Sequence, residues 1–327
     1  MRWQRLGYTA LGVFALLLLA FLYFRTPDTD PAAMRAKYGA PPSQFVDLGG
    51  GLTVHLRDTG PRDAQALMLI HGANASLHTW EPWAARLGDR YRVIRIDLPG
   101  HGLTGASPTG DYSPKALASV IERVRVRLNV DRLIVVGSSM GGGVAWHYAL
   151  LNPGHVRALV LADSVGQPNR AAGNPSLVFQ VMRVPLLRDL ALAITPRDMV
   201  ADGLRSAFHD RRQISDAMVD RSWELLRYPG NRSAMLDRFT QPSDVASVAD
   251  LRQLAMPTLI LWGADDRMIP VSSAQWLHAH IPGSKIIIYP NTGHALMEER
   301  SDQSASDLAR FIEALPADSA AGRDLGG

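Results

Sequence analysis

Two glycines flank a serine at the junction of a strand-like segment and a helix-like one. This motif limits the fold more than any other part of the chain. Gly137 and Gly141 lie two residues before and two residues after Ser139, in the run GSSMG. The apolar run RLIVV precedes the motif, and the helix-like run GGVAWHYALL follows it. A serine exposed in a tight strand–turn–helix connection needs very small neighbours at these two positions. The frame around Ser138 would put a valine and a methionine there, so Ser139 is the stronger candidate nucleophile.

Apolar runs recur along the chain and alternate with longer stretches of helical pattern. Several of these runs, such as LMLI and LIVV, are uninterrupted, which is typical of parallel strands covered by helices on both faces. The alternation predicts an α/β fold with a mostly parallel central sheet flanked by helices. The predicted strands are Thr53–Arg57, Leu67–His71, Tyr91–Asp97, Leu133–Gly137, Leu159–Asp163, Thr258–Trp262 and Lys285–Tyr289.

One long interval, residues 165–248, breaks this alternation because it contains helical patterns and no convincing strand. Thr195-Pro196 predicts an N-cap followed by a proline in the first turn, and Ser215 predicts a second N-cap. A single crossover connection needs far fewer residues, so we predict a helical cap. The predicted division is a core formed by residues 31–164 and 249–316, the cap at 165–248, and a disordered tail at 317–327.

The N-terminus carries an uncharged apolar run, Leu6–Phe24, which as a helix would span roughly 28 Å. A cleaved signal peptide is the competing interpretation, but it would have a shorter apolar region and a small-residue cleavage site. Phe-Leu-Tyr-Phe-Arg stands here instead. We therefore predict that residues 1–30 form an uncleaved signal anchor and linker. The run would be a single-pass transmembrane helix, with the membrane as partner and the catalytic domain on the non-cytoplasmic side.

Cysteine content and charge exclude several classes of function. The chain has no cysteine, which excludes disulfides, thiolate metal sites and a cysteine nucleophile. The net charge is +3 and the basic residues are interspersed with acidic ones, so we predict no nucleic-acid partner. His278 and His280 lie in one helical pattern, where their rings would face different sides, so we predict no metal site there.

A serine nucleophile needs a base, and the base needs an acid that orients it. In chains with this kind of serine turn, the acid and then the histidine follow the serine. Asp266 follows the strand TLILWG, and His294 follows the strand KIIIY. Both lie just beyond strand ends, where open α/β sheets bind their ligands. Asp265, beside Asp266, and Asp163, at the end of an earlier strand, remain alternatives for the acid.

The run His71-Gly72-Ala73-Asn74 follows the predicted strand 67–71. Glycine at this place lets the backbone turn sharply and present an amide towards the serine. The backbone N–H groups of Ala73 and Met140 are therefore predicted to form an oxyanion hole.

A second glycine-rich run, Gly100–Gly105, matches the pattern G-x-G-x-x-G. A dinucleotide-binding fingerprint opens a helix directly after its strand. Here Pro99 precedes the glycines and Ser107-Pro108 follows, so no helix N-terminus is available for a pyrophosphate. We predict no nucleotide site.

Five motifs, HGAN, DLPGHG, GSSMGG, WGADDRMIP and NTGH, resemble those of the α/β-hydrolase superfamily in order and spacing. The resemblance covers about Phe45 to Leu315. The insertion that begins DGLRSAFHD and ends YPGNR looks like the cap of membrane-anchored, lipase-like esterases of that superfamily. The resemblance implies the α/β-hydrolase fold and no cofactor. The site residues that it implies are Ser139 as nucleophile, His294 as base, Asp266 (just before Arg267) as acid, and Ala73 and Met140 as oxyanion donors.

The resemblance also separates this chain from some relatives. Haloalkane dehalogenases and epoxide hydrolases of this fold carry aspartate where Ser139 stands. Carbon–carbon bond hydrolases of the family usually have a glycine-rich stretch after HG, whereas ANASLHTW follows here. We expect a serine hydrolase that cleaves small-molecule carboxylic esters, including lipophilic ones, as a carboxylesterase or lipase-like enzyme. The alternatives are a carbon–carbon hydrolase or perhydrolase with the same triad, and a non-catalytic binding protein, against which the intact triad argues.

Overall fold

A computed structural model describes residues 2–168, 184–241 and 245–316. Its strands form one eight-stranded sheet in the order β1-β2-β4-β3-β5-β6-β7-β8. Strands β3 to β8 run parallel to one another, and β1 and β2 form an antiparallel edge. The strands are β1 (Ser43–Asp47), β2 (Thr53–Thr59), β3 (Ala66–Ile70), β4 (Arg92–Ile96), β5 (Leu133–Ser138), β6 (Val156–Ala162), β7 (Thr258–Gly263) and β8 (Lys285–Tyr289).

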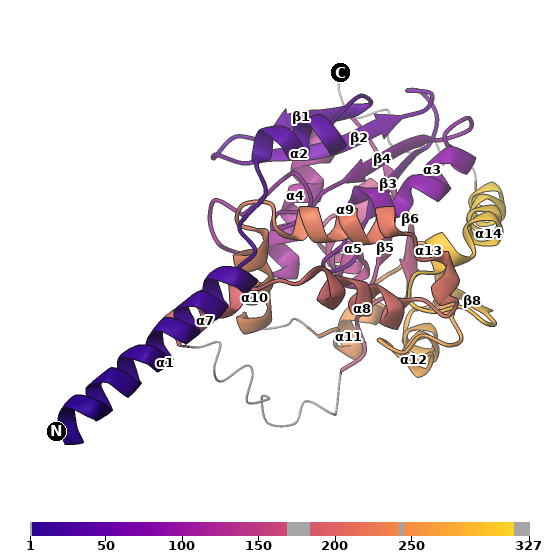
Figure 1. The fold of residues 1–327 in the computed structure, drawn as a ribbon. Coiled ribbons are helices and arrows are strands. Elements are labelled where there is room, and N and C mark those ends of the chain that lie inside the picture. Colours follow the sequence, from indigo (N-terminus) through magenta and orange to yellow (C-terminus); the bar gives the residue numbers. More distant parts are fainter. Residues whose placement is uncertain (1, 169–183, 242–244, 317–327) are drawn as a thin grey trace.

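Helices cover both faces of the sheet (Figure 1). Strand β5 is buried at every position because it lies inside the sheet with both faces covered. Because β3 to β8 are parallel, their carboxyl ends lie together at one edge of the sheet, where a site can form. One face packs against α4 (Pro114–Arg127), α5 (Met140–Leu151) and α12 (Ser272–His280), and the other against η1 (Leu77–Trp80), α3 (Glu81–Leu87), α13 (Leu296–Glu299) and α14 (Ser301–Glu313).

The predicted α/β sheet is confirmed, and a strand forms at each predicted place within a few residues. Strand β1 was not predicted. Its sequence, SQFVD, contains only two consecutive apolar residues, Phe45 and Val46, and its residues are half-buried or exposed. An edge strand of this kind lacks the long apolar run that marks a strand covered on both faces.

The described residues between β6 and β7 form helices and no strand. Ser215 caps α9 as predicted, because its side chain accepts a hydrogen bond from the N–H of Met218. Thr195 does not cap α8, because the N-cap of this helix is Pro196. The hydroxyl of Thr195 donates to the Leu192 carbonyl instead. Part of the predicted cap and the predicted tail lie outside the described residues. The helices are α7 (Pro185–Leu192), α8 (Arg197–Ala207), α9 (Asp216–Leu226), α10 (Asn231–Thr240) and α11 (Val248–Arg252); we call α7 to α10 the cap helices.

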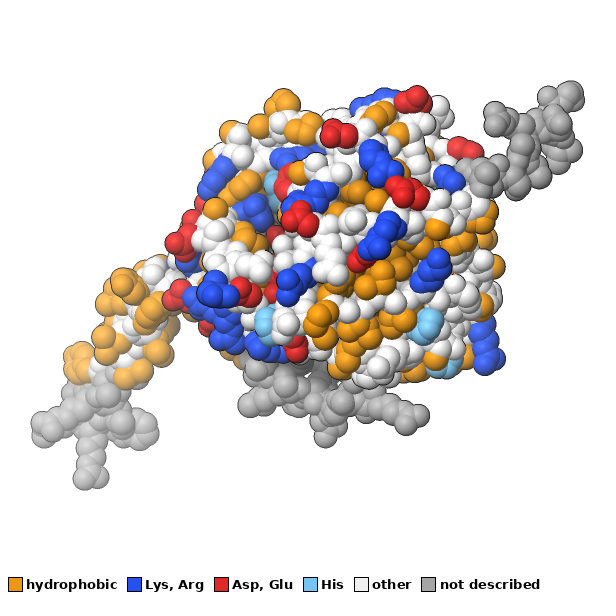
Figure 2. Space-filling model, turned by 90° about the vertical axis from the view of Figure 1, so that its right-hand side faces the viewer, with side chains coloured by type: hydrophobic (Ala, Val, Ile, Leu, Met, Phe, Trp, Pro, Cys, Tyr) orange, Lys and Arg blue, Asp and Glu red, His pale blue; other side chains and the backbone are white. Residues whose placement is uncertain are grey.

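Near the N-terminus the chain forms one helix, α1 (Arg2–Phe24), which stands away from the sheet (Figure 1). Its described side chains, Leu11 and Phe14 among them, are largely apolar and exposed (Figure 2). Among the residues that the structure describes, no helix combines the length and the hydropathy needed to cross a membrane. The transmembrane helix predicted over Leu6–Phe24 stays a prediction.

The segment that follows α1 is hydrogen-bonded to the cap helices. Arg232 of α10 donates hydrogen bonds to the carbonyl of Thr26 at 2.9 Å and to the carboxylate of Asp28 at 2.5 Å. Further along, Lys37 at the end of α2 (Pro31–Tyr38) forms an ion pair of 2.7 Å with Glu224 of α9. Residues 26–38 therefore form part of the cap surface.

Candidate active site

Ser139 lies at the turn between β5 and α5 with a strained backbone, at φ 54° and ψ −120°. A Cβ atom at Gly137 would lie 2.1 Å from the carbonyl oxygen of Gly141, and one at Gly141 would lie 2.3 Å from that of Ile70. Side chains at these two positions would therefore collide with backbone. Ser139 is partly exposed while Ser138 is buried, so the turn presents Ser139, as predicted.

His294 and Asp266 form a hydrogen-bonded pair beyond the ends of β8 and β7. Nδ1 of His294 lies 2.7 Å from Oδ2 of Asp266. The other oxygen, Oδ1, accepts hydrogen bonds from the backbone N–H groups of Met268 at 2.7 Å and Ile269 at 2.9 Å. The backbone thus fixes the carboxylate, and the carboxylate fixes the ring. In the neutral ring this pairing puts the proton on Nδ1 and leaves Nε2 with the lone pair that a base needs.

The two alternative acids have other partners. Oδ1 of Asp163 accepts a hydrogen bond from the N–H of Gly263 at 2.8 Å. Burial, reinforced by the nearby charge of Asp266, raises the pKa of Asp163 well above its usual range, which disfavours the ionised form of this carboxyl. The carboxylate of Asp265 lies 3.1 Å from Nδ1 of His209 of the cap. Among the three candidates, Asp266 is the one that the structure pairs with the histidine.

The loop after β3 packs against the serine turn. A Cβ atom at Gly72 would lie 3.1 Å from the Cβ atom of Ser139, which explains the glycine. His71 orients this loop, because its Nδ1 donates to the carbonyl of Gly72 at 2.7 Å and its Nε2 accepts from the N–H of Leu98 at 3.1 Å. Burial lowers the pKa of His71, in keeping with one nitrogen that donates and one that accepts.

The two predicted oxyanion donors come from different elements next to this turn. Met140 is the first residue of α5, and the first N–H groups of a helix have no acceptor within it. Ala73 directly follows Gly72, on an exposed part of the loop. Because the N-terminus of a helix also favours negative charge, this place suits an oxyanion.

Asp97, which the sequence analysis did not single out, ties the loops around the site together. Its Oδ1 accepts from the N–H of Leu77 at 2.7 Å, and its Oδ2 accepts from the N–H of Leu103 at 2.9 Å and lies 2.7 Å from Nδ1 of His55. Burial opposes its ionisation, yet the neighbouring His55 holds the pKa of Asp97 well below its usual range. A Cβ atom at Gly102 would lie 1.9 Å from this carboxylate. Gly102, in the run GHGLTG, therefore makes room for Asp97, and an aspartate three residues before that run was the available signal.

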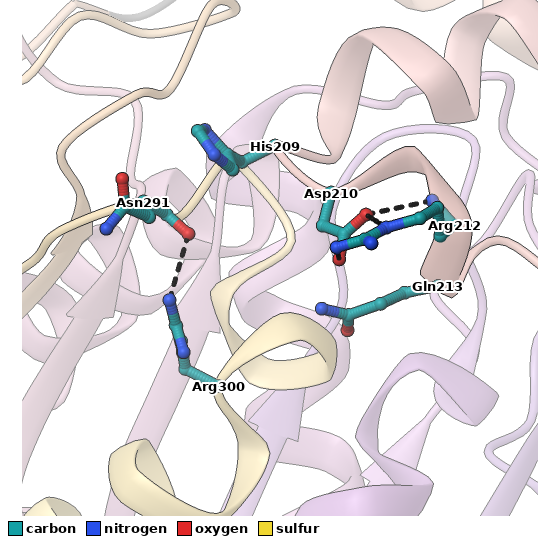
Figure 3. Close-up of a pocket in the computed structure, with 6 residues that line it drawn as sticks. All are labelled: His209, Asp210, Arg212, Gln213, Asn291 and Arg300. Carbon is teal, nitrogen blue, oxygen red and sulfur yellow. Dashed lines mark hydrogen bonds and ion pairs between the residues drawn. The ribbon is translucent and has the colours of Figure 1, made fainter.

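A pocket of about 320 Å³ opens where the cap meets the loop before His294 (Figure 3). Its charged groups are paired, because Arg212 binds Asp210 at 2.9 Å and Arg300 donates to the carbonyl of Asn291 at 3.2 Å. None of the predicted site residues lines it. The lining residues are His209, Asp210, Arg212 and Gln213 from the cap side, with Asn291 and Arg300 from the other side.

The two helical histidines bind neighbouring groups of their own region. Nδ1 of His278 lies 3.0 Å from the hydroxyl of Ser284, and Nδ1 of His280 lies 2.7 Å from the carbonyl of Trp276. In the described part of the chain, no three histidine, aspartate or glutamate side chains come together as metal ligands would.

Comparison with known proteins identifies the family of this chain. A family model described as "alpha/beta hydrolase fold" matches residues 65–301, a span that includes the serine turn and the histidine–aspartate pair. A solved structure described as a membrane phospholipase A superposes with a TM-score of 0.72 at 24% sequence identity, and the match covers 96% of this chain and 99% of that one. At this identity the likeness shows the fold alone.

Curated relatives match most of the chain. An uncharacterised protein of Mycobacterium tuberculosis is 31% identical over 287 residues, which cover 84% of this chain and 80% of that protein. The 2-hydroxy-6-oxo-2,4-heptadienoate hydrolase of Pseudomonas putida is 27% identical, with 78% and 90% covered. The pimeloyl-(acyl-carrier protein) methyl ester esterase of Aliivibrio salmonicida is 28% identical, with 76% and 92% covered. The named relatives act on unlike substrates, so the comparisons single out no substrate class.

Proposed function

The chain belongs to the α/β-hydrolase family, and we propose that it is a serine hydrolase that cleaves carboxylic esters. The observation that carries the proposal is the hydrogen-bonded pair of His294 and Asp266, which follows two strands ending at the same sheet edge as the strained Ser139 turn. In this proposal Ser139 is the nucleophile, His294 the base and Asp266 the acid that orients the base.

The reaction begins when Oγ of Ser139 attacks the ester carbonyl carbon and passes its proton to Nε2 of His294. Asp266 stabilises the imidazolium that forms. The carbonyl oxygen becomes an oxyanion, to which the N–H groups of Ala73 and Met140 donate. One such donor typically contributes about 3 kcal/mol to stabilisation of the transition state.

The tetrahedral intermediate then collapses. The bond between the acyl carbon and the alcohol oxygen breaks, and His294 returns its proton to the leaving alcohol. Water next attacks the acyl group on Ser139 while His294 takes the water's proton. Collapse of the second intermediate releases the carboxylic acid and returns the proton to Ser139, so that one ester and one water give one acid and one alcohol.

The nucleophile is tested with a fluorophosphonate probe and a panel of chromogenic esters of graded acyl length. The native chain should be labelled at Ser139 and should hydrolyse at least part of the panel. Ser139→Ala should lose the label and about 10⁶-fold in kcat, because no other group takes the place of the hydroxyl. Ser138→Ala is the matched control and should keep the label. Full activity in Ser139→Ala, or labelling on Ser138, overturns the assignment.

A carbon–carbon bond hydrolase with the same serine is the second candidate, and the relative from Pseudomonas putida supports it. The stretch ANASLHTW after His71-Gly72 favours the ester hydrolase, because the carbon–carbon hydrolases usually carry glycines there. Turnover of a 2-hydroxy-6-oxo-dienoate at a higher kcat/KM than every ester of the panel would favour the second candidate.

We also propose that the N-terminal run Leu6–Phe24, whose side chains the structure describes only in part, anchors the chain in a membrane with the hydrolase domain on the non-cytoplasmic side, which would suit a lipase-like enzyme and lipophilic esters. The support is the uncharged run Leu6–Phe24 together with the exposed apolar side chains of α1. The full chain should sediment with membranes, whereas a chain that starts at Thr29 should not. A reporter fused after Leu315 should give a non-cytoplasmic signal. A cytoplasmic signal would reverse the orientation, and full-length protein in the soluble fraction would refute the anchor.

A further inference from the structure

The last residue of α8 and the connection that leads to η3 (Arg211–Gln213), residues 207–210, lie directly against the loop that carries His294; we call this segment the cap junction. The backbone N–H of His294 donates to the carbonyl of Ala207 at 2.7 Å. A Cβ atom at Gly293 would lie 2.3 Å from that carbonyl oxygen and 2.7 Å from the nitrogen of His209. The cap junction therefore contacts the backbone next to the proposed base, at a distance that glycine alone allows.

The carboxylate of Glu299 joins the two segments. Its Oε1 accepts a hydrogen bond from the N–H of Gly293 at 2.8 Å. Its Oε2 accepts from the N–H groups of His209 at 2.9 Å and Asp210 at 3.1 Å. Glu299 is only 9% exposed, and hydrogen bonds to an ionised acceptor are stronger than those between neutral groups. Three backbone donors from two distant parts of the chain thus converge on one buried carboxylate.

The same junction also reaches the loop that carries the acid. The ring of His209 lies 3.1 Å from the carboxylate of Asp265, which directly precedes Asp266. The N–H of Asp265 in turn donates to the carbonyl of Thr292 at 2.9 Å, two residues before His294. In the view of Figure 3, His209 lies on the same side of the pocket as Asn291, which belongs to the His294 loop. The cap junction therefore contacts both loops that present the histidine–aspartate pair.

We propose that Glu299 is a positioning residue for the hydrolysis proposed above, on which this inference rests. Its carboxylate holds the cap junction against the His294 loop and so keeps the base in place relative to Ser139. A displacement of about 1 Å at a reacting group can lower the rate by about 10²-fold. Because the same carboxylate binds the cap, a movement of the cap at residues 207–210 displaces His294 as well.

The test removes one acceptor of the carboxylate and keeps its shape. In Glu299→Gln, an NH2 group replaces one carboxylate oxygen. This group would face backbone N–H groups and cannot accept hydrogen bonds from them. We expect kcat for a chromogenic ester and the rate of fluorophosphonate labelling at Ser139 to fall together by about 10- to 100-fold, with KM changed less than about threefold. Asp302→Asn is the control, since that side chain is 86% exposed and pairs with Arg86. It should label at the native rate.

A second pair of variants tests the same contact without changing Glu299. His209→Ala removes the ring and keeps the backbone donor, whereas His209→Pro removes both. Phe208 has ψ of 139°, a value that a residue before proline readily adopts. The labelling rate should fall in His209→Pro by about as much as in Glu299→Gln, and much less in His209→Ala. This comparison decides the matter if Glu299→Gln does not fold, as judged by thermal unfolding.

The outcomes separate the inference from the proposed function. Native labelling rates in Glu299→Gln and His209→Pro, or a raised KM with an unchanged labelling rate, overturn the role of Glu299 alone. A native chain that the probe does not label at Ser139 overturns the proposed function, and this inference with it.

Discussion

The carboxylate of Asp266 lies 2.7 Å from Nδ1 of His294, although 28 positions separate the two residues in the chain. Backbone N–H groups hold the second carboxylate oxygen, so the acid cannot rotate away without losing those bonds. The histidine is held from its own side, because its backbone N–H is bonded to the cap. Both partners are thus fixed before any substrate binds, which is the preorganisation that acid–base catalysis requires.

Asp266→Asn should lower kcat by about 10⁴-fold, because an amide nitrogen cannot accept the Nδ1 proton and the ring takes the wrong tautomer. Asp163→Asn should have a much smaller effect, since Asp163 accepts a hydrogen bond from Gly263 and its raised pKa disfavours the ionised form. Steady-state rates of the two variants on one chromogenic ester decide between them. The reverse ranking would make Asp163 the acid.

Asp163→Asn should make stability less dependent on pH. Burial raises the pKa of Asp163, so the folded protein keeps a proton that the unfolded chain loses above about pH 4. The stability that this group contributes is complete below that pH and is lost as the pH rises towards the raised value. The free energy of unfolding, measured with urea at pH 5 and pH 8, should therefore fall less in the variant than in the native chain. An equal fall in both proteins would contradict the raised pKa of Asp163.

Gly72→Ala should lower kcat by about 10²-fold, because the added Cβ atom would lie 3.1 Å from that of Ser139 and displace this proposed nucleophile. Gly154→Ala is the matched control, since no atom lies within 4 Å of a Cβ there. Circular dichroism should show both variants folded. Native activity in Gly72→Ala would show that the loop after β3 can move away from the serine without loss.

Arg232→Ala should loosen the segment that follows α1 and cost about 1–3 kcal/mol of stability. The guanidinium is largely buried and donates to the carbonyl of Thr26 and the carboxylate of Asp28, and these acceptors would lose their partner. Arg212→Ala is the control, because that side chain is 90% exposed and an exposed ion pair contributes about 0–1 kcal/mol. Thermal unfolding and limited proteolysis between residues 26 and 38 should separate the two variants. Equal behaviour would show that the segment is not held by Arg232.

Local sequence determined the layers of the fold and the position of the serine. Uninterrupted apolar runs mark strands such as β5, because a strand covered on both faces has no polar side. Gly137 and Gly141 mark the turn at Ser139, because only glycine fits against the backbone there. Strand β1 was not predicted, because a half-buried edge strand carries no uninterrupted apolar run.

The tertiary structure showed which aspartate binds the histidine and which residues support that pair. Asp163, Asp265 and Asp266 all lie close after strand ends, so strand position alone does not distinguish them, and only the family resemblance implied Asp266. Burial, charge and hydrogen-bond direction distinguish the three aspartates, and these properties exist only once the chain is folded. Glu299 is the clearest case, because its carboxylate binds the N–H of His209, 90 positions earlier in the chain. A contact over that separation leaves no local pattern, since packing brings the donor and the acceptor together.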